Sequence, residues 1–276
     1  MLPESFWGRV LFLLEKYGTS YLRGAGETML IAVIGTAVGC LIGLLVGIVQ
    51  TIPKDREEHP FKSFLTGFFQ VLLNIYVEVF RGTPMMVQAV FIYYGAAMLW
   101  NIHMPTLTAA LLIVSINTGA YMAETVRGGI LSVDVGQTEG AMAIGMNHFQ
   151  TMVEVILPQA VRNIMPQIGN NLIINIKDTC VLSVISVVEL FFANKSVAGA
   201  YYTYFESATI TMIIYFTLTF TCSRLLRLVE NKMDGPDNYD LATTDTLAFT
   251  SGMTRFPDPA SKREKEHLNA DIREGR

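Results

Sequence analysis

The chain has 276 residues, of which 51% are hydrophobic and 16% are charged, and its formal net charge is −4 at pH 7. Such an apolar composition is typical of membrane proteins, and the absence of a basic stripe excludes nucleic acid as a partner. The three cysteines lie in apolar runs at unrelated spacings, so we expect small buried side chains and neither disulfides nor metal ligands.

The N-terminal part predicts an interfacial segment followed by a first membrane span. Residues 1–26 interleave aromatic and aliphatic side chains with Arg9 and Lys16, as in helices that lie at a bilayer surface. Residues 28–49 carry no charged side chain, and about 20 such residues cross a bilayer. Glycines at positions 35, 39, 43 and 47 give this span a face that another helix can approach closely.

Residues 50–62 hold many charges and are expected in water. Residues 64–80 are apolar but include Glu78, which favours a helix that lies at the interface or leads into the membrane. We expect Thr83 to cap the next helix and Pro84 to occupy its first position. Residues 85–100 then cross, so that the region 64–100 contains one crossing with a broken lead-in.

The second half predicts three more crossings. Residues 105–123 form an uncharged span, and residues 207–223 form the last one. Residues 164–192 would extend about 43 Å as a straight helix. That length predicts a helix that is tilted, broken or partly outside the membrane. From residue 233 onward the chain is polar, which favours a disordered tail without an assigned function.

Five crossings put the termini on opposite sides, and the positive-inside rule selects the orientation. The cations nearest the spans favour an outside N-terminus and a cytoplasmic C-terminus. The inner set is Lys54, Arg56, Lys62, Arg81, Arg127, Arg162, Arg224, Arg227 and Lys232, and the outer set is Arg9, Lys16, Arg23 and Lys195.

A stretch of mixed polarity lies between two strongly apolar segments, at residues 139–158 with the sequence EGAMAIGMNHFQTMVEVILP. The predicted orientation places it in the cytoplasm. From the residues alone, a helical hairpin that docks a partner and a solvated hairpin between spans are equally favoured.

No residue pattern predicts catalysis. The four histidines are scattered over loops and the tail, and no HExxH, GxSxG, CxxC or phosphate-loop motif occurs. We therefore expect no catalytic residue, no metal and no cofactor. Uphill transport would have to draw its energy from a partner or an ion gradient.

The mixed stretch resembles the cytoplasmic loop of ABC importer permeases. That loop has the pattern Glu-Ala-Ala, a glycine, an isoleucine and a final Leu-Pro, and the corresponding residues here are Glu139, Gly140, Ala141, Gly145, Val155, Leu157 and Pro158. Gly140 and Val155 are departures from the pattern. Glycine in place of alanine lowers helix propensity by up to about 1 kcal/mol.

Four further sequence motifs extend the resemblance over about residues 20–232. They are Arg81-Gly-Thr-Pro84 with Gln88, the segment Ala120–Ile130, Gly136-Gln137, and Lys177-Asp178-Thr179 followed by Glu189-Leu190, with Cys180 in place of serine. Together they resemble permeases of the polar amino-acid branch, the histidine, glutamine and arginine type, with the MetI-like transmembrane fold.

This resemblance implies an all-α integral membrane protein with a permease domain at 27–232 and a coupling loop at about 128–165. A short coupling helix at about 136–145 would enter a groove on the ATPase. Ala141 and Gly145 would permit close approach, and Glu139 would supply a charge. Pro158 and Pro166 are expected to set helix starts.

The implied partners are a separate ABC ATP-binding subunit that hydrolyses ATP, a second permease subunit (identical or paralogous), an external amino-acid-binding protein and membrane lipid. The implied location is the bacterial cytoplasmic (inner) membrane, which the chain crosses several times. The sequence does not name the amino acid.

Polar groups within spans are candidates for the substrate path, because lipid disfavours them. The candidates are Gln88, Ser115, Asn117, Asn170, Asn171, Asn175 and Glu189. Hydrogen bonding between helices is an equally favoured role for Asn117 and Asn175. An acidic side chain at position 171 would attract a cationic substrate. The neutral Asn171 therefore favours a substrate without a cationic side chain.

Two other pairs of charged residues lie near spans. Lys177 and Asp178 are adjacent and point to different faces, so we expect each to meet another helix, a partner or water. Glu124 and Arg127 are one turn apart, which favours a local pair over a brace for the coupling helix.

Two competing functions remain. In an ion-coupled secondary transporter or channel, Lys177, Asp178 and Glu189 would form an ion path, and transport would not need ATP. Inverted repeats would favour this function, and none is evident. A membrane scaffold needs no polar groups in its spans, so Asn117 and Asn171 count against it.

Overall fold

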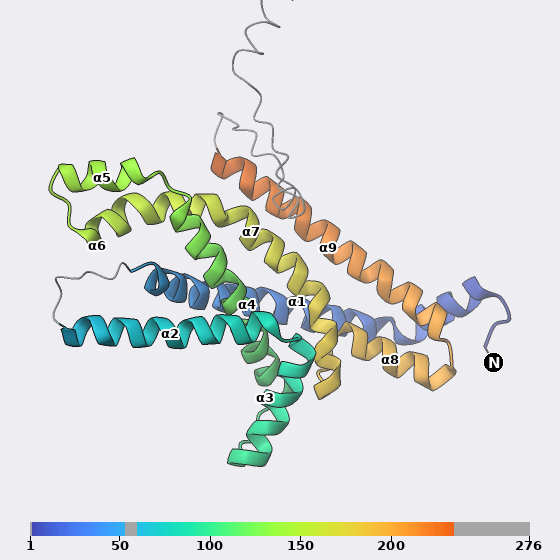
Figure 1. The fold of residues 1–276 in the computed structure, drawn as a ribbon. Coiled ribbons are helices and arrows are strands. Elements are labelled where there is room, and N and C mark those ends of the chain that lie inside the picture. Colours follow the sequence, from blue (N-terminus) through green and yellow to red (C-terminus); the bar gives the residue numbers. More distant parts are fainter. Residues whose placement is uncertain (1, 53–59, 235–276) are drawn as a thin grey trace, which may run out of the picture. The chain divides into compact units, whose positions relative to one another are not determined.

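The computed structural model describes residues 2–52 and 60–234, and within these residues every regular element is a helix. The all-α prediction is confirmed. Residues 1–230 form one compact unit. The helices are α1 (Phe6–Thr51), α2 (Pro60–Gly82), α3 (Met85–Trp100), α4 (Thr106–Leu131), α5 (Val135–Ala143), α6 (His148–Gln150), η1 (Thr151–Ile156), α7 (Leu157–Asp178), η2 (Thr179–Ile185), α8 (Leu190–Tyr201) and α9 (Tyr204–Asp234) (Figure 1).

Four helices of the described residues are long and apolar enough to cross a membrane, namely Phe6–Thr51, Ser63–Gly82, Thr106–Leu131 and Tyr204–Glu230. Residues 63–82, expected to lead into the membrane, are thus a better candidate for a crossing than the shorter helix α3. The five crossings, the orientation and the domain limits stay predictions. Nearly all of the expected tail lies outside the described residues.

The expected crossing at 164–192 is broken, as one of the alternatives predicted. α7 ends at Asp178, and the 3-10 helix η2 continues the chain to Ile185. Ser186 adopts a left-handed conformation with φ 64°, which turns the chain toward α8. Because α8 begins after this turn, it lies along the first half of α1 rather than extending α7 (Figure 1).

α1 is a single helix of 46 residues, about 69 Å long at 1.5 Å per residue. That length is about twice the hydrocarbon thickness of a bilayer. No helix end separates residues 1–26 from the expected first span, and Val10, Leu13 and Tyr21 of the first half are buried in a cluster with residues of α8 and α9. The interfacial position of residues 1–26 stays a prediction.

The row of glycines on α1 packs against α4. A Cβ atom added at Gly35 would lie 2.5 Å from Val114, one at Gly39 would lie 2.6 Å from Thr118, and one at Gly47 would lie 2.7 Å from Val126. Each of these distances is shorter than real Cβ contacts. The two backbones are therefore closer than any larger side chain would allow, as the spacing of the glycines predicted.

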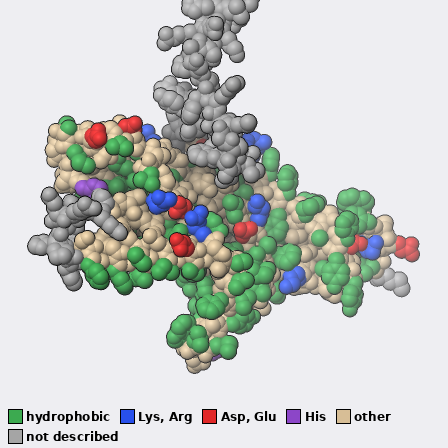
Figure 2. Space-filling model, viewed as in Figure 1, with side chains coloured by type: hydrophobic (Ala, Val, Ile, Leu, Met, Phe, Trp, Pro, Cys, Tyr) green, Lys and Arg blue, Asp and Glu red, His purple; other side chains and the backbone are tan. Residues whose placement is uncertain are grey.

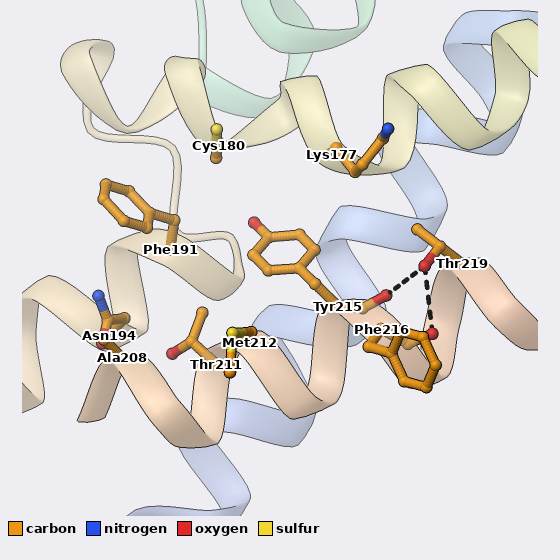
Figure 3. A pocket seen from close by; sticks show the side chains of 10 residues that line it. All are labelled: Lys177, Cys180, Phe191, Asn194, Ala208, Thr211, Met212, Tyr215, Phe216 and Thr219. Carbon is orange, nitrogen blue, oxygen red and sulfur yellow. Dashed lines mark hydrogen bonds between the residues drawn. The ribbon is translucent and has the colours of Figure 1, made fainter. Parts of the chain in front are cut away.

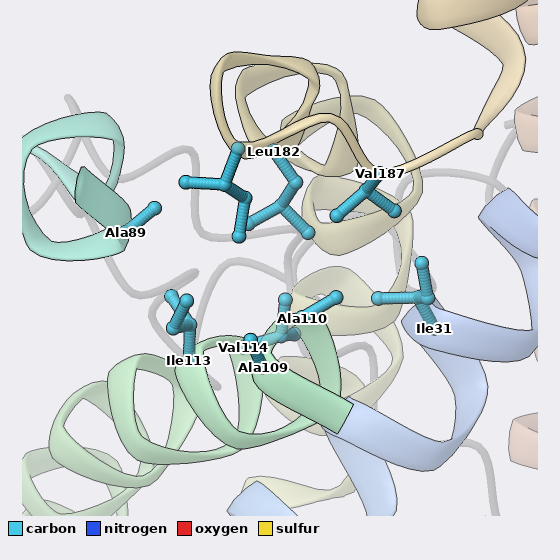
Figure 4. Packing of buried hydrophobic residues seen from close by; sticks show 9 residues of the cluster. Ile31, Ala89, Ala109, Ala110, Ile113, Val114, Leu182 and Val187 are labelled. Atoms are coloured by element: carbon cyan, nitrogen blue, oxygen red, sulfur yellow. The ribbon is translucent and has the colours of Figure 1, made fainter. Parts of the chain in front are cut away.

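The main hydrophobic cluster joins four elements that are far apart in the sequence. Ile31 of α1 and Ala109 of α4 pack with Ala89 of α3 and with Leu182 of η2, and all four are fully buried (Figure 4). The small alanines bring α3 and α4 together. This cluster fixes the 3-10 segment beside the start of α4.

The break between α2 and α3 differs from its prediction. Pro84, rather than Thr83, is the N-cap residue of α3, and it offers no side-chain hydrogen bond. The Thr83 hydroxyl instead donates to the Val79 carbonyl at 2.7 Å and accepts from Gln88 Nε2 at 2.8 Å. Thr83 therefore closes the last turn of α2, and the expected capping of α3 was wrong.

Candidate functional site

The loop between α4 and α7 contains a short helix at the position where a coupling helix was expected. α5 spans Val135–Ala143, against the predicted 136–145. The Asp134 side chain caps it by accepting from the Gly136 N–H at 2.7 Å. The chain then reverses at Gly145, whose φ of +90° is a conformation that glycine adopts without strain. A capping box of Asn147 and Gln150 starts the return helix.

The small residues of the loop have a different role from the expected one. Ala141 is 6% exposed and faces its own chain, where α5 packs against η1. Its small side chain thus closes the hairpin and does not offer a surface to a partner. Glu139 and Gly140 lie on the exposed side of α5, and a Cβ atom at position 140 would meet nothing within 4 Å. Replacing the family's alanine by Gly140 therefore disturbs no packing.

The outer surface of the loop is apolar. Val135 is 69% exposed, Ile144 is 80% exposed and Phe149 is 75% exposed. The predicted topology places these side chains in the cytoplasm, where lipid cannot cover them. An apolar surface of this kind is typical of a site where another protein binds.

The return helix continues without interruption from α6 through η1 into α7. Pro158 lies in the first turn of α7, and Leu157 is partly buried against Met122 and its neighbours. Pro166 lies inside α7, so its expected role as a helix start was wrong. The helix tolerates this proline, although proline has no N–H and the Arg162 carbonyl, four residues earlier, therefore loses its usual backbone donor.

Two of the candidate polar residues tie the α2–α3 break to α4. Asn117 Nδ2 donates to Gln88 Oε1 at 2.9 Å, and both residues are buried. Gln88 Nε2 donates in turn to the carbonyls of Phe80 and Thr83, each at 2.9 Å. These amides satisfy backbone groups that the break in the helix leaves free, which supports the role in helix–helix bonding.

Asn175 and Asn171 lie on the face of α7 that meets α1 and α4. Asn175 Nδ2 donates to Thr36 of α1 at 2.7 Å and to Thr118 of α4 at 2.9 Å, so that one amide joins three helices. Asn171 Nδ2 donates to the sulfur of Met122 at 3.2 Å. Asn170 points to the exposed side, and Ser115 is buried beside Gly39.

Glu189 is fully buried and caps α8. Its carboxylate accepts from the backbone N–H groups of Phe191 at 2.8 Å and Phe192 at 2.7 Å, and from the Tyr215 hydroxyl at 3.0 Å. Three donors therefore occupy this carboxylate. It joins the start of α8 to the middle of α9.

A cavity of about 460 Å³ lies between α7, η2 and α8 on one side and α9 on the other (Figure 3). Lys177 and Cys180 lie on one side of it, with the Lys177 nitrogen directed away from α9, and Tyr215 and Thr211 form part of the opposite wall. The predicted substrate-path residues included neither Lys177, which was named only for the alternative ion path, nor the α9 residues. Their signal is the spacing of Thr211, Tyr215 and Thr219, which places three polar side chains on one face of an apolar helix.

Charged side chains meet where α2 crosses α4. Arg127 Nε donates to Glu124 Oε2 at 3.3 Å, so the expected local pair is present. Arg81 approaches the same carboxylate at 3.8 Å and lies over the Tyr121 ring at 5.8 Å from its centroid. Acidic and basic side chains are close together in the middle of one face, whereas hydrophobic side chains cover much of the surface around them (Figure 2).

Comparison with known proteins identifies related membrane components. Residues 63–235 match the family described as "Binding-protein-dependent transport system inner membrane component". The "Glutamine transport system permease protein GlnP" of Escherichia coli (strain K12) is 35% identical over 231 residues, which are 83% of this chain and 96% of that protein. The "Arginine transport system permease protein ArtQ" of Bacillus subtilis (strain 168) is 32% identical over 216 residues, which are 78% and 93% of the two chains.

Solved structures share the fold. A "Crystal structure of an amino acid ABC transporter with histidines" superposes with a TM-score of 0.69 at 34% identity, covering 79% of this chain and 96% of that chain. An inward-facing MetNI methionine ABC transporter has a TM-score of 0.61 at 19% identity and covers 79% and 99% of the two chains. The second likeness concerns the fold alone.

Proposed function

The chain belongs to the family of binding-protein-dependent transport system inner membrane components, and on this premise we propose that it carries an amino acid across the membrane at the expense of ATP. It is a permease subunit with the MetI-like fold, and the permease subunits of such importers form the translocation path. The ion-coupled alternative is not favoured.

The coupling loop is the observation that carries the ATP-driven part of this proposal. It consists of a capped helix, a glycine turn and a return helix, and it has an exposed apolar surface. We assign ATP hydrolysis to a separate ATP-binding subunit that docks on α5 and the following turn. Glu139, Gly140 and Gly145 lie on the proposed docking side, whereas Ala141 and Leu157 are turned toward the protein and Pro158 is exposed in the first turn of α7.

The proposed substrate is an uncharged polar amino acid of the glutamine type. Lys177 lines the cavity of about 460 Å³, and reorientation of its exposed, flexible side chain would bring a positive charge to a substrate carboxylate. The hydroxyl and amide groups of Thr211 and Asn194 suit a polar side chain. The nearby Glu189 carboxylate already accepts three hydrogen bonds. A cationic side chain would therefore find no free anion there.

The proposed assembly contains two permease subunits, identical or paralogous, two ATP-binding subunits and an external amino-acid-binding protein in the bacterial inner membrane. The apolar candidate spans fit a multi-pass position in such a membrane. Of the other candidate residues of the path, Gln88, Asn117, Asn171 and Asn175 serve mainly to hold the helices in place through hydrogen bonds, whereas Asn170 lies on the exposed side of α7 and Ser115 is buried.

Reconstitution tests the proposal. The permease is purified with a co-expressed ATP-binding subunit, placed in lipid vesicles with the binding protein, and assayed for uptake of each of the twenty amino acids. We expect uptake that requires ATP and favours an uncharged polar amino acid. Uptake without ATP would support the ion-coupled alternative, and equal failure with all twenty would overturn the substrate class.

A further inference from the structure

The segment η1 (Thr151–Ile156) is a π-helical turn inserted between the coupling loop and α7. The backbone N–H of Leu157 bonds to the carbonyl of Met152, five residues earlier, instead of four. Turns of this type are rare and occur mostly as single insertions at functional sites. Compared with a continuous α-helix, one extra residue rotates everything before it by about 100° and shifts it by about 1.5 Å.

Pro158 favours the wide turn at this position, although α7 accommodates Pro166 without one. In an α-helix its ring would clash with the carbonyl of Glu154, and it has no N–H to bond that carbonyl. A π turn moves the carbonyl away from the ring. Gln159 compensates for part of the missing ladder, because its Nε2 donates to the Val155 carbonyl at 2.9 Å and lies 3.4 Å from Gln137 Oε1 on α5.

The inner side of this turn is loosely packed. A surface hollow of about 180 Å³ lies between the end of α4, α5 and η1. Thr151, Met152 and Ile156 line it from η1, and the exposed Val135 and His148 lie at its edge. Thr151 is 1% exposed, and its hydroxyl oxygen is buried without a hydrogen-bond partner. A buried hydroxyl without a partner raises the free energy of the observed arrangement. The hollow gives its side chain room to move.

The two ends of the turn are held differently. Beyond it, α7 is fixed to α1 and α4 by the hydrogen bonds of Asn175, and Ile164 packs against Gly129. Before it, α5 reaches the rest of the chain mainly through η1. The hairpin is also joined to α4 through residues 132–134, so relative movement between the hairpin and the membrane helices would be shared between that connection and Thr151–Ile156.

We propose that η1 is a mechanical joint that switches between a π and an α turn when the coupling loop moves. The α form would turn α5 relative to α7, carry Thr151 into the hollow and give its hydroxyl a backbone partner. This inference rests on the proposed function, because it needs an ATP-binding subunit to move the loop. Beyond the proposed function, the inference identifies η1 as the segment through which movement of the coupling loop is transmitted to α7.

Pro158→Ala tests the joint, with Pro166→Ala as the matched control in the same helix. Alanine at position 158 supplies the missing N–H and removes the ring, so the α turn is favoured permanently. In the parent protein and both variants the native cysteines are replaced by serine. Spin labels at Met142→Cys, on an exposed position of α5 outside the assigned docking residues, and at Arg162→Cys measure the distance across the joint with and without ATP.

We expect a nucleotide-dependent change of this distance in the parent protein and in P166A, and its loss in P158A. P158A should still co-purify with the ATP-binding subunit, while its uptake per ATP hydrolysed falls about tenfold, the factor that corresponds to about 1.4 kcal/mol. Normal movement and uptake in P158A, or loss of subunit binding, would overturn the joint. A parent protein that imports with ATP but shows no distance change would overturn it too, whereas absent ATP-dependent uptake would overturn the proposed function.

Discussion

The amide of Asn175 holds three helices with two hydrogen bonds, to Thr36 and Thr118. Replacement by leucine keeps the approximate size but removes both bonds. Each hydrogen bond between membrane helices contributes about 0.6 to 1.7 kcal/mol. We therefore expect Asn175→Leu to lower the unfolding temperature in detergent, while Asn170→Leu, on the exposed side of the same helix, leaves it unchanged. Equal stability of the two variants would contradict the bridging role.

The carboxylate of Glu189 offers a test between a helix cap and an ion path. Glu189→Gln keeps a side-chain oxygen that accepts from α8, whereas Glu189→Ala removes the cap at a cost of about 1 kcal/mol. If Glu189 acts as a helix cap, we expect the glutamine variant to retain most uptake and the alanine variant to lose stability. If the glutamine variant abolished uptake while its melting temperature stayed the same, the carboxylate charge itself would be needed.

Among the elements, the contact between α1 and α4 depends most on side-chain size. Gly39→Leu would place a side chain against Thr118, and inserting extra carbon atoms into a packed contact destabilises by about 1–3 kcal/mol. Gly26→Leu on the same helix meets open space. We expect only the former to reduce the yield of folded protein, measured by size-exclusion chromatography in detergent. A comparable loss for both variants would point to helix propensity.

Sequence patterns predicted the elements whose cause is local. The spacing of the α1 glycines predicted the close contact, and the loop motif predicted α5 within two residues of its bounds. The patterns failed where packing and backbone hydrogen bonding decide. Ala141 faces η1 rather than a partner protein, and Thr83 bonds back to α2, because backbone groups freed by the break there require donors. No pattern pointed to the π turn, because Pro158 favours it but Pro166 in the same helix does not produce one.

At the scale of the whole molecule, the exposed surface of the coupling loop should govern assembly. Phe149→Asp puts a charge into an apolar contact and should weaken association with the ATP-binding subunit by at least about tenfold, since buried aromatic anchors contribute about 2 kcal/mol or more. Gly140→Ala, which adds a methyl group in open space, should leave association unchanged or strengthen it. Pull-down titrations measure both. Unchanged binding of Phe149→Asp would place the docking surface elsewhere.

The long first helix also constrains how the protein is made. Tyr21 bonds to Ser207, and Lys16 bonds to Tyr201, across 186 and 185 positions of the chain. At synthesis rates of about 5–20 residues per second, the ribosome needs about ten seconds or more to reach these partners. During that time the first half of α1 lacks its final neighbours. The N-terminal half of α1 is therefore synthesised first but reaches its final packing last, when α8 and α9 have been made and pack against it.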